Sequence, residues 1–457
     1  MTFDQYVIDA HAPCASYHLN LRGTWKIGPA QGNGRASDTV TNVDAGTLTE
    51  ADAETYIRGI CFKTGPPGTV GVELEWLVRD RDDPAAAVTP DRLAAALATL
   101  GTADGDVYRG EALQTVLDNA RITVEPGGQL ELSSAPAGNL GELVNATCDD
   151  LAQLRAAAGG SGLELCGYGL DPLRLPDRVL DLPRYQAMEQ FFDRTGPWGR
   201  QMMRATASVQ VCLDAGEEDG GRNGYPERWR LLHAIGPVLV AAFANSPLRG
   251  GRPTGWRSSR QQVWSHLDPS RTKPPPSAKD PRDAWAEYAL NAEVMCVRTE
   301  GTQDWTAPGG LTFRDWIRSG QPRPPSISDL DYHLTTLFPP VRPHGHLELR
   351  MIDAQPGDGW IVPTAVVTAL AEDPAAADQA EEAAEPVKHR WLDAARNGPA
   401  DAAIARASRA CFDAARQALP RLGVPELIQN AVDDFTERYV QRNRCPADDQ
   451  LEGITQS

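Results

Sequence analysis

The 457-residue sequence has no apolar run long enough to cross a membrane. Its longest strongly apolar stretch, residues 237–244, is far shorter than the roughly 20 residues that a spanning helix needs. Residues 1–14 also lack the basic start and apolar run of a secretion signal. We therefore expect a cytoplasmic protein with no membrane partner.

Basic residues are in deficit: 44 lysines and arginines stand against 62 aspartates and glutamates, which gives a net charge of −18. This balance disfavours nucleic acids and anionic membrane surfaces as partners, because both bind basic patches. It leaves ATP open, since a metal ion and arginine side chains can meet the charge of ATP locally. We expect small-molecule substrates and no nucleic-acid partner.

Cysteine motifs are missing as well. The eight cysteines show no CxxC pair and no zinc-like spacing, which predicts free buried thiols in a reducing compartment. A catalytic thiol is the alternative, but the sequence nominates no base to activate it. No low-complexity linker divides the chain, so we predict an irregular leader over residues 1–50 and a single catalytic domain over residues 51–457, mostly helical from about residue 363.

What the sequence does contain is acidic residues inside three strand-like apolar runs, at residues 70–76, 125–132 and 346–350. Alternate side chains of a strand share one face, so Glu73 and Glu75 point away from the apolar side chains between them. Two like charges about 4 Å apart repel by roughly 4 kcal/mol at an effective dielectric of about 20. Such a cluster requires a counter-cation. Mg²⁺ prefers oxygen ligands and holds phosphates, so ATP chemistry is the leading hypothesis.

Hydrophobic spacing predicts the elements around these runs. We expect helices over residues 90–100, 139–158, 183–195 and 227–244. We expect strands over residues 69–79, 121–134 with a break at Gly127-Gly128, and 205–213.

One face of the predicted strands carries polar side chains. They are Glu73, Glu75, Glu131, Thr206, Gln210, His346, Glu348 and Arg350. An ordinary antiparallel sheet with one solvated side is the alternative interpretation. A solvated face usually mixes Lys, Thr, Arg and Ser, whereas this one is acidic with an amide and one arginine at its end. The composition therefore favours a binding or catalytic site.

Five longer blocks of sequence occur in the order found in a known family, at residues 122–136, 184–203, 206–214, 243–264 and 331–354. On these blocks the chain resembles the plant-type glutamate-cysteine ligases and their bacterial relatives. It is most similar to the actinobacterial members that serve ergothioneine synthesis. The resemblance implies an α+β, glutamine-synthetase-like carboxylate-amine ligase fold, with a curved, mainly antiparallel sheet and helices packed on its outer face.

The reaction that the resemblance implies is ATP-dependent. The γ-carboxylate of L-glutamate takes the γ-phosphoryl group of ATP, and the α-amine of L-cysteine then displaces phosphate to give γ-glutamylcysteine. The family also implies two or three Mg²⁺ ions, with ATP as co-substrate. We expect a monomer or a weak homodimer.

The resemblance further implies metal ligands and a phosphate clamp. By their positions in the motifs, the metal-facing residues are Glu73, Glu75, Glu125, Glu131, Gln210 and Glu348. Arg350 follows Glu348 by two residues on the same strand face and resembles the arginine that binds the γ-phosphate, for which its planar fork is suited. Glu125 and Glu131 have turn capping as their alternative role.

Substrate and nucleotide contacts are implied in the same way. Arg260 matches an arginine that pairs with a substrate carboxylate, and Thr206 and Trp264 are assigned to substrate beside it. Arg271 and Thr272 match a loop near the reaction site and are assigned to the nucleotide. The alternatives are a packing aromatic at residue 264 and a plain solvated loop at residues 271–272.

Two other functions stay open. A ligase of the same fold could use a different amine, because no residues that recognise the cysteine thiol are identifiable in the sequence. A non-catalytic nucleotide-binding relative is the second, although such a protein is expected to have lost metal carboxylates or the clamping arginine, and here all these positions are filled.

Overall fold

The computed structural model describes residues 17–19, 25–27, 47–65, 68–100, 108–109, 113–218, 221–276, 280–299 and 301–455. Most of the predicted leader lies outside these residues; within it, strand β1 (Tyr17–Leu19) pairs with β2 (Trp25–Ile27) and helix α1 (Glu50–Cys61) begins at its end. The irregular character of the leader and the single catalytic domain stay predictions. Among the described helices, none combines the length and apolar character needed to cross a membrane.

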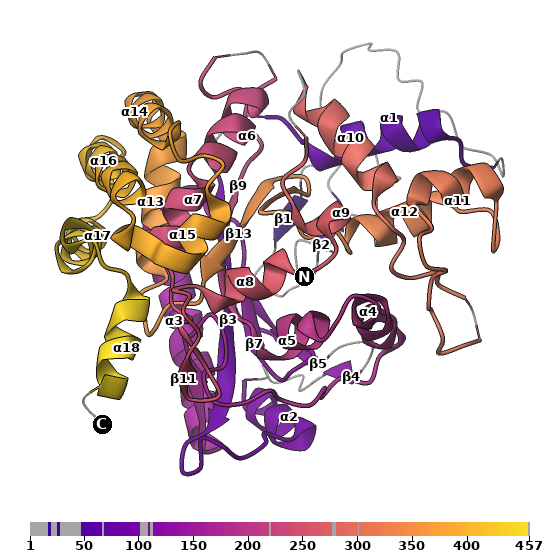
Figure 1. Cartoon of the computed structure of the whole chain (residues 1–457), viewed down its shortest axis with the longest axis horizontal. Helices are drawn as coiled ribbons and strands as arrows, with labels where there is room; N and C mark the ends of the chain where they lie inside the picture. The colour runs from indigo at the N-terminus through magenta and orange to yellow at the C-terminus, as the bar shows by residue number, and fades with distance from the viewer. Residues whose placement is uncertain are drawn as a thin grey trace.

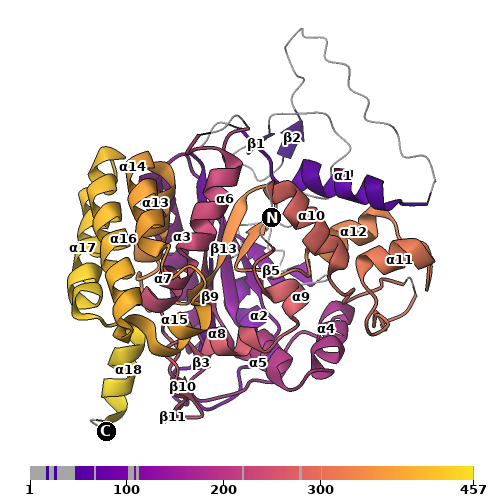
Figure 2. The ribbon, with the colours of Figure 1, turned by 45° about the horizontal axis from the view of Figure 1, so that its top comes forward.

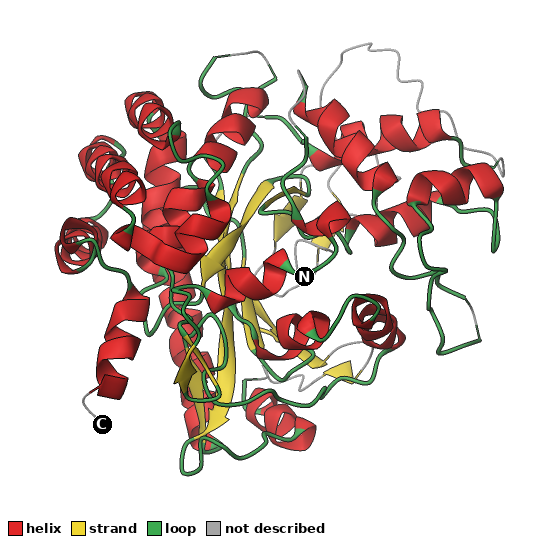
Figure 3. Ribbon diagram, in the orientation of Figure 1, coloured by secondary structure: helices red, strands yellow, loops and turns green. Residues whose placement is uncertain are grey.

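A nine-stranded sheet forms the centre of the described chain (Figure 3). Its strands are β3 (Val70–Asp80), β4 (Tyr108–Arg109), β5 (Leu113–Val116), β6 (Ala120–Val124), β7 (Leu130–Ser134), β8 (Leu163–Cys166), β9 (Ser208–Leu213), β12 (Val341–Pro343) and β13 (Leu347–Asp353). The order is β12-β13-β9-β3-β7-β6-β5-β4, and β8 pairs with the far end of β3. Each of these pairings is antiparallel, which confirms the predicted sheet type.

Helices pack on both sides of the sheet, and further helices lie beyond them (Figure 1). They are α2 (Pro90–Ala98), α3 (Leu140–Gly160), α4 (Pro183–Asp193), α5 (Trp198–Ala205), α6 (Tyr225–Ala234), α7 (Gly236–Ala242), α8 (Ser259–Ser265), α9 (Pro269–Thr272), α10 (Pro281–Asn291), α11 (Phe313–Ser319), α12 (Ile327–Leu334), α13 (Ile361–Glu372), α14 (Pro374–Ala384), α15 (Trp391–Asn397), α16 (Ala402–Arg421), α17 (Glu426–Arg438) and α18 (Pro446–Thr455). Two short 3₁₀ helices (Gly398–Ala400 and Val440–Arg442) and the small hairpin of β10 (Leu248–Arg249) and β11 (Arg252–Pro253) complete the described elements.

The apolar face of the sheet makes the main core. In β3, Val72, Leu74 and Trp76 are at most 3% exposed, because α3, α7 and α13 pack on this side of the sheet. Figures 1 and 2 show α13, α14, α16 and α17 gathered beyond this face, with α1 and α10–α12 at the opposite end of the molecule. One cluster of buried apolar side chains extends from Leu48 to Val440, so helices before and after the sheet share a core.

Most predicted elements are present, and two need correction. The predicted helix over residues 227–244 is two helices, α6 and α7, which meet at Ile235 because Pro237 lacks the N–H of a continuing helix. The predicted strand over residues 205–213 begins only at Ser208, because α5 runs to Ala205. The prediction of a mostly helical C-terminal region is confirmed by α13–α18.

The hairpin between β6 and β7 explains the Gly127-Gly128 pair. Gly128 has a φ of +88°, which disfavours any residue with a Cβ atom. A Cβ on Gly127 would lie 2.0 Å from the carbonyl oxygen of Arg204. The two glycines therefore let the hairpin turn against the end of α5, which places Glu125 and Glu131 on either side of the turn.

The cysteines follow the prediction. All seven described cysteines are free, and Cys14 lies outside the described residues. Six of the seven are buried, so packing rather than disulfide bonding explains them.

Asp150 in α3 gives a pH-dependent prediction. It is fully buried beneath the β5–β6 turn, and burial raises its pKa to about 6 although the Asn119 N–H donates to Oδ2 over 3.1 Å. The folded state therefore holds this proton more tightly than the unfolded state. The resulting stabilisation is complete below about pH 4 and is lost as the pH rises through about 6.

In D150N this site carries no charge at any pH. The free energy of unfolding of the variant should therefore rise relative to the wild type by about 2 kcal/mol between pH 4 and pH 8. Denaturant titrations of both proteins across this range measure the difference. A difference that does not change with pH would contradict the raised pKa.

Candidate functional site

The polar face of the sheet brings the predicted polar residues together on four neighbouring strands. On β3, Glu73 lies opposite Gln210 of β9 and Glu75 lies opposite Glu131 of β7. Residues directly opposite in an antiparallel pair have Cβ atoms about 5 Å apart and share a face. On β13, Glu348 lies opposite Cys212 of β9, which is two residues from Gln210 and on the same face of the sheet.

This face is buried. The exposed fractions of Glu73, Glu131, Gln210 and Glu348 are 7%, 7%, 1% and 1%. The solvated-face alternative is therefore wrong for these four positions, since a wet face leaves its polar groups in water. Carboxylates are not buried without partners that compensate their charge, so the sheet face needs cations and hydrogen-bond donors.

Arginines supply part of that compensation at Glu348. Arg342 of β12 binds the carboxylate through both Nε (2.6 Å) and Nη2 (3.1 Å), and Arg350 Nη1 donates to the same group. Burial opposes ionisation of Glu348, but Arg342 and Arg350 outweigh it and hold the pKa of this carboxyl well below its usual range. Glu348 is thus a fixed anion between two cations.

Gln210 connects Arg350 to Glu75. Its amide oxygen accepts from Arg350 Nη1 over 2.6 Å, and its amide nitrogen donates to Glu75 Oε1 over 3.3 Å. Ser208 also donates to Glu75, over 3.0 Å. The carboxylate of Glu75 is therefore held in place by two donors from β9.

The hairpin carboxylates lie at the next strand pair. Glu131 accepts from the hydroxyls of Thr123 (3.2 Å) and Ser133 (3.1 Å). Burial, followed by the charges of Glu125 and Glu131, raises the pKa of Tyr185 in α4. The hairpin acids therefore lie near enough to α4 for their charge to act on this phenol.

The fit of these residues to a metal ion is partial. In the part of the chain that the structure describes, no three His, Cys, Asp or Glu side chains converge closely enough to hold one ion. The donor set is nevertheless all oxygen, as Mg²⁺ prefers, and Glu73, Glu75 and Glu131 occupy adjoining positions on paired strands.

Arg260 of α8 lies beneath the end of this row. It is 3% exposed, and Nη2 donates to the carbonyl oxygen of Arg350 over 2.8 Å. Within the described residues, Nε and Nη1 have no hydrogen-bond partner although both are buried. A buried guanidinium with unused donors suits an anionic ligand.

A small cavity of about 30 Å³ adjoins Arg350 where α8, α9 and β13 meet. It is lined by Gln261, Trp264, Thr272, Phe338, Pro339, Pro340, Arg350 and Met351. Trp264 Nε1 and Arg350 Nε are buried there and have no hydrogen-bond partner in the described part of the chain. The structure thus brings Trp264 and Thr272 beside the arginine that the sequence assigns to phosphate.

Arg271 and Thr206 have structural contacts instead. Arg271 is fully buried: Nε binds Asp268 (2.9 Å), Nη1 binds the Thr336 carbonyl (2.8 Å) and Nη2 donates to the Glu293 carbonyl. The guanidinium is occupied in joining loops, and its assignment to the nucleotide stays a prediction that these contacts do not favour. Thr206 lies at the end of α5, not on β9, and its hydroxyl donates to the Met202 carbonyl over 2.7 Å. Its substrate contact stays a prediction.

Two residues of this region were missed by sequence reasoning. Arg342 lies six residues before Glu348 on a strand of three residues, too short for an alternation pattern to reveal. Asp353 ends β13 beyond a register shift between Leu349 and Ile352, where simple alternation no longer assigns a face. A strand-period count that allowed for a bulge would have drawn attention to Asp353.

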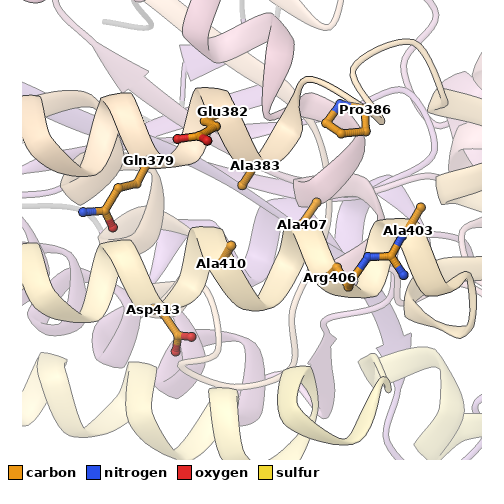
Figure 4. A pocket seen from close by; sticks show the side chains of 9 residues that line it. All are labelled: Gln379, Glu382, Ala383, Pro386, Ala403, Arg406, Ala407, Ala410 and Asp413. Carbon is orange, nitrogen blue, oxygen red and sulfur yellow. The ribbon is translucent and has the colours of Figure 1, made fainter.

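A larger groove, of about 520 Å³, lies between α14 and α16 away from the sheet (Figure 4). It is lined by Gln379, Glu382, Ala383, Pro386, Ala403, Arg406, Ala407, Ala410 and Asp413. Alanines make the groove by leaving space between the two helices. None of the lining residues belongs to the sheet, so the groove has no part in the site.

Comparisons with known proteins find similar sequences. The family model described as Glutamate-cysteine ligase family 2 (GCS2) matches residues 69–452. The chain is 40% identical over 425 residues to glutamate–cysteine ligase EgtA of Mycobacterium tuberculosis, with 91% of each protein covered. It is 34% identical over 246 residues to the chloroplastic glutamate–cysteine ligase of Medicago truncatula, which covers 51% of this chain and 47% of the plant protein.

A solved structure is similar in fold. The crystal structure of glutamate–cysteine ligase from Francisella tularensis in complex with AMP superposes with a TM-score of 0.50 at 14% identity, over 86% of each chain. This likeness and the antiparallel sheet confirm the predicted α+β, glutamine-synthetase-like carboxylate-amine ligase fold.

Proposed function

Because the chain belongs to glutamate-cysteine ligase family 2, we propose that it joins the γ-carboxylate of L-glutamate to the α-amine of L-cysteine. ATP is cleaved to ADP and phosphate in the same reaction, and γ-glutamylcysteine is the product. The observation that carries the proposal is the buried polar face of the sheet, where Glu348 and Arg350 meet Gln210 and Glu75. Buried carboxylates with adjoining arginines suit the transfer of a phosphoryl group, in which charge compensation does most of the work.

The metal would be held by the oxygen ligands of this face: Glu73, Glu75 and Glu131, with Gln210 and Glu125 beside them. Glu348 would join them if Arg350 released its carboxylate. Mg²⁺ bound there would neutralise charge on the phosphates and polarise the γ-phosphoryl group. The proposed site holds two or three Mg²⁺ ions. The side chains of the protein bind and orient the substrates.

In the first step, a γ-carboxylate oxygen of glutamate attacks the γ-phosphorus of ATP, the bond to ADP breaks, and γ-glutamyl phosphate forms. Arg350 is placed to meet the charge of the transferring group, because its Nε is buried and unused beside the cavity. In the second step, the α-amine of cysteine attacks the acyl carbon, phosphate leaves, and the amine loses a proton as the amide forms.

The other carboxylate of glutamate needs a cation of its own. Arg260 is the best candidate, since Nε and Nη1 have no hydrogen-bond partner in the described residues and Trp264 lies beside it with its ring centroid 5.8 Å from the guanidinium carbon. A carboxylate bound there would lie close to Arg350, since Arg260 donates a hydrogen bond to the backbone carbonyl of Arg350. Substrate and phosphate would thus be fixed by the same pair of elements, α8 and β13.

We further propose that γ-glutamylcysteine made by this chain enters ergothioneine synthesis, as the resemblance to the actinobacterial ligases implies. The cytoplasmic location and the monomeric or weakly dimeric state belong to the same proposal. Trp264 and Thr206 are assigned to substrate and Thr272 to nucleotide as predicted from sequence.

The experiment that tests the function is ADP release with Mg²⁺, ATP and L-glutamate, with and without L-cysteine, coupled to mass analysis of the product. Cysteine-dependent turnover that yields γ-glutamylcysteine is the expected result. Turnover that ignores cysteine and responds to another amine would assign the chain to a ligase of different specificity. No turnover with any amine, in folded protein that still binds ATP, would indicate a non-catalytic relative.

A further inference from the structure

Asp353 is a buried carboxylate that the proposed reaction does not use directly. It ends β13, is 2% exposed, and accepts three hydrogen bonds. Oδ2 accepts from the backbone N–H of Asn245 (2.9 Å) and the hydroxyl of Ser246 (2.7 Å), and Oδ1 accepts from the hydroxyl of Ser258 (2.9 Å). Its Oδ1 also lies 3.9 Å from Arg260 Nη1.

These contacts fix the start of helix α8. Ser258 is the N-cap, and its oxygen accepts from the N–H of Gln261 over 3.1 Å. The oxygen of Ser246 accepts from the N–H of Arg260, also over 3.1 Å. Because Asp353 takes the hydroxyl hydrogens of both serines, their lone pairs are left to face the helix N–H groups.

The position of the carboxylate itself is tightly set. A Cβ atom on Gly169 would lie 2.4 Å from Cγ of Asp353, so the chain passes the carboxyl group at a place where only glycine fits. Asp353 also pairs in register with Ser208, whose hydroxyl binds Glu75. Asp353 thus connects the sheet, through the hydroxyl of Ser246, to the backbone N–H of Arg260.

The guanidinium of Arg260 has two further constraints. Nη2 donates to the Arg350 carbonyl, and the charge of Asp353 faces Nη1 at a distance too long for a hydrogen bond. Burial lowers the pKa of Arg260, and the nearby carboxylates of Asp353 and Glu75 oppose this change. Nε and Nη1 have no hydrogen-bond partners in the described residues. Their orientation is set by the contact of Nη2 with the Arg350 carbonyl and by the charge of Asp353.

We propose that Asp353 is the positioning residue of Arg260 and sets the affinity of the site for the carboxylate of the amino-acid substrate. This inference rests on the proposed function, because it takes glutamate as the ligand of Arg260. Asp353 touches no substrate. It acts by holding the first turn of α8 and the guanidinium in the orientation that receives the carboxylate.

The test is D353N, which keeps the shape of the side chain and replaces one of its acceptor oxygens with an NH₂ donor. Whichever side the new amide group takes, it meets a hydroxyl or N–H donor that formerly had an acceptor. The KM for L-glutamate should rise about tenfold or more, while the KM for ATP and kcat change by less than about threefold. Isothermal titration of L-glutamate into the same proteins gives the affinity without turnover.

A matched control is D373N. Asp373 is a second buried carboxylate that supports the start of a helix and faces an arginine: as the N-cap of α14 it accepts from the Ala376 N–H over 2.9 Å and from Arg421 over 2.8 Å. This variant should lose thermal stability and keep its glutamate affinity. If D353N loses stability in the same way and also keeps its glutamate affinity, Asp353 is only structural and the proposal is overturned.

Coupling to Arg260 is the second readout. In an R260A background, D353N should have no further effect on glutamate affinity, since the residue acts through that arginine. An equal additional loss would show an independent route and contradict the proposal. Should D353N fail to fold, S246A and S258A each remove one of the contacts and take its place, with the same expected loss of glutamate affinity.

Failure of the proposed function looks different. Wild-type protein that binds no glutamate and shows no glutamate-dependent turnover would refute the function, and with it the ligand on which this inference depends. Wild-type protein that binds glutamate, with D353N binding equally well, would refute only the role of Asp353.

Discussion

Replacing Arg350 with alanine should lower kcat for glutamate-dependent ATP cleavage by about three orders of magnitude, the scale of losing an arginine that stabilises a transferring phosphoryl group. The physical reason is the position of Arg350 between Glu348, Gln210 and the cavity of the site. The fold should survive, because Glu348 keeps its two-point contact with Arg342. Steady-state ADP release and a thermal melt of the same sample measure both expectations.

The control for this variant is R155A. Arg155 on α3 pairs with Asp358 over 2.8 Å, but the two side chains are 37% and 56% exposed. An exposed ion pair contributes about 1 kcal/mol or less, so R155A should keep near-normal turnover. Near-normal turnover in R350A would refute the assignment of Arg350 to the phosphate.

Replacing Glu75 with glutamine should lower turnover at least about a hundredfold and raise the Mg²⁺ concentration needed for half-maximal rate. Glutamine keeps the size of the side chain and one oxygen, but it removes the negative charge that a divalent cation requires. Its oxygen can still accept from Ser208 or Gln210, which now bind the carboxylate of Glu75, so the sheet should stay intact. Titration of Mn²⁺ followed by its electron paramagnetic resonance signal reports metal affinity without turnover.

E164Q is the matched control for this change. Glu164 lies on β8, which also pairs with β3, but it is exposed to solvent. Its loss should alter neither the metal requirement nor the rate. If E75Q binds Mn²⁺ as tightly as the wild type and keeps its rate, the metal centre does not lie on this part of the sheet.

The sequence predicts the strands that carry the site better than the contacts between them. Alternation in β3 identifies Glu73 and Glu75 correctly as sharing a face, because strand periodicity is a local property of the chain. The sequence does not show that this face is buried. Burial arises from helices distant in sequence, among them α8, which carries Arg260.

Arg271 shows that a motif match alone does not establish what a side chain contacts. Its motif resembles a functional loop, yet its partners are Thr336 and Glu293, far along the chain, and these occupy its guanidinium. Arg342 and Asp353 were missed for a related reason: each gains its role from a partner on another element, Glu348 for the first and Ser258 for the second. Roles that depend on a partner in another element follow from the fold and not from spacing.

The central claim is that the polar sheet face transfers the γ-phosphoryl group of ATP to the γ-carboxylate of glutamate. It is tested most directly by supplying glutamate labelled with oxygen-18 in that carboxylate, together with ATP, Mg²⁺ and cysteine. Since phosphate leaves from γ-glutamyl phosphate with one oxygen of the former carboxylate, mass analysis should find one labelled oxygen in each phosphate released. Phosphate released without label, while γ-glutamylcysteine accumulates, would contradict the acyl-phosphate route.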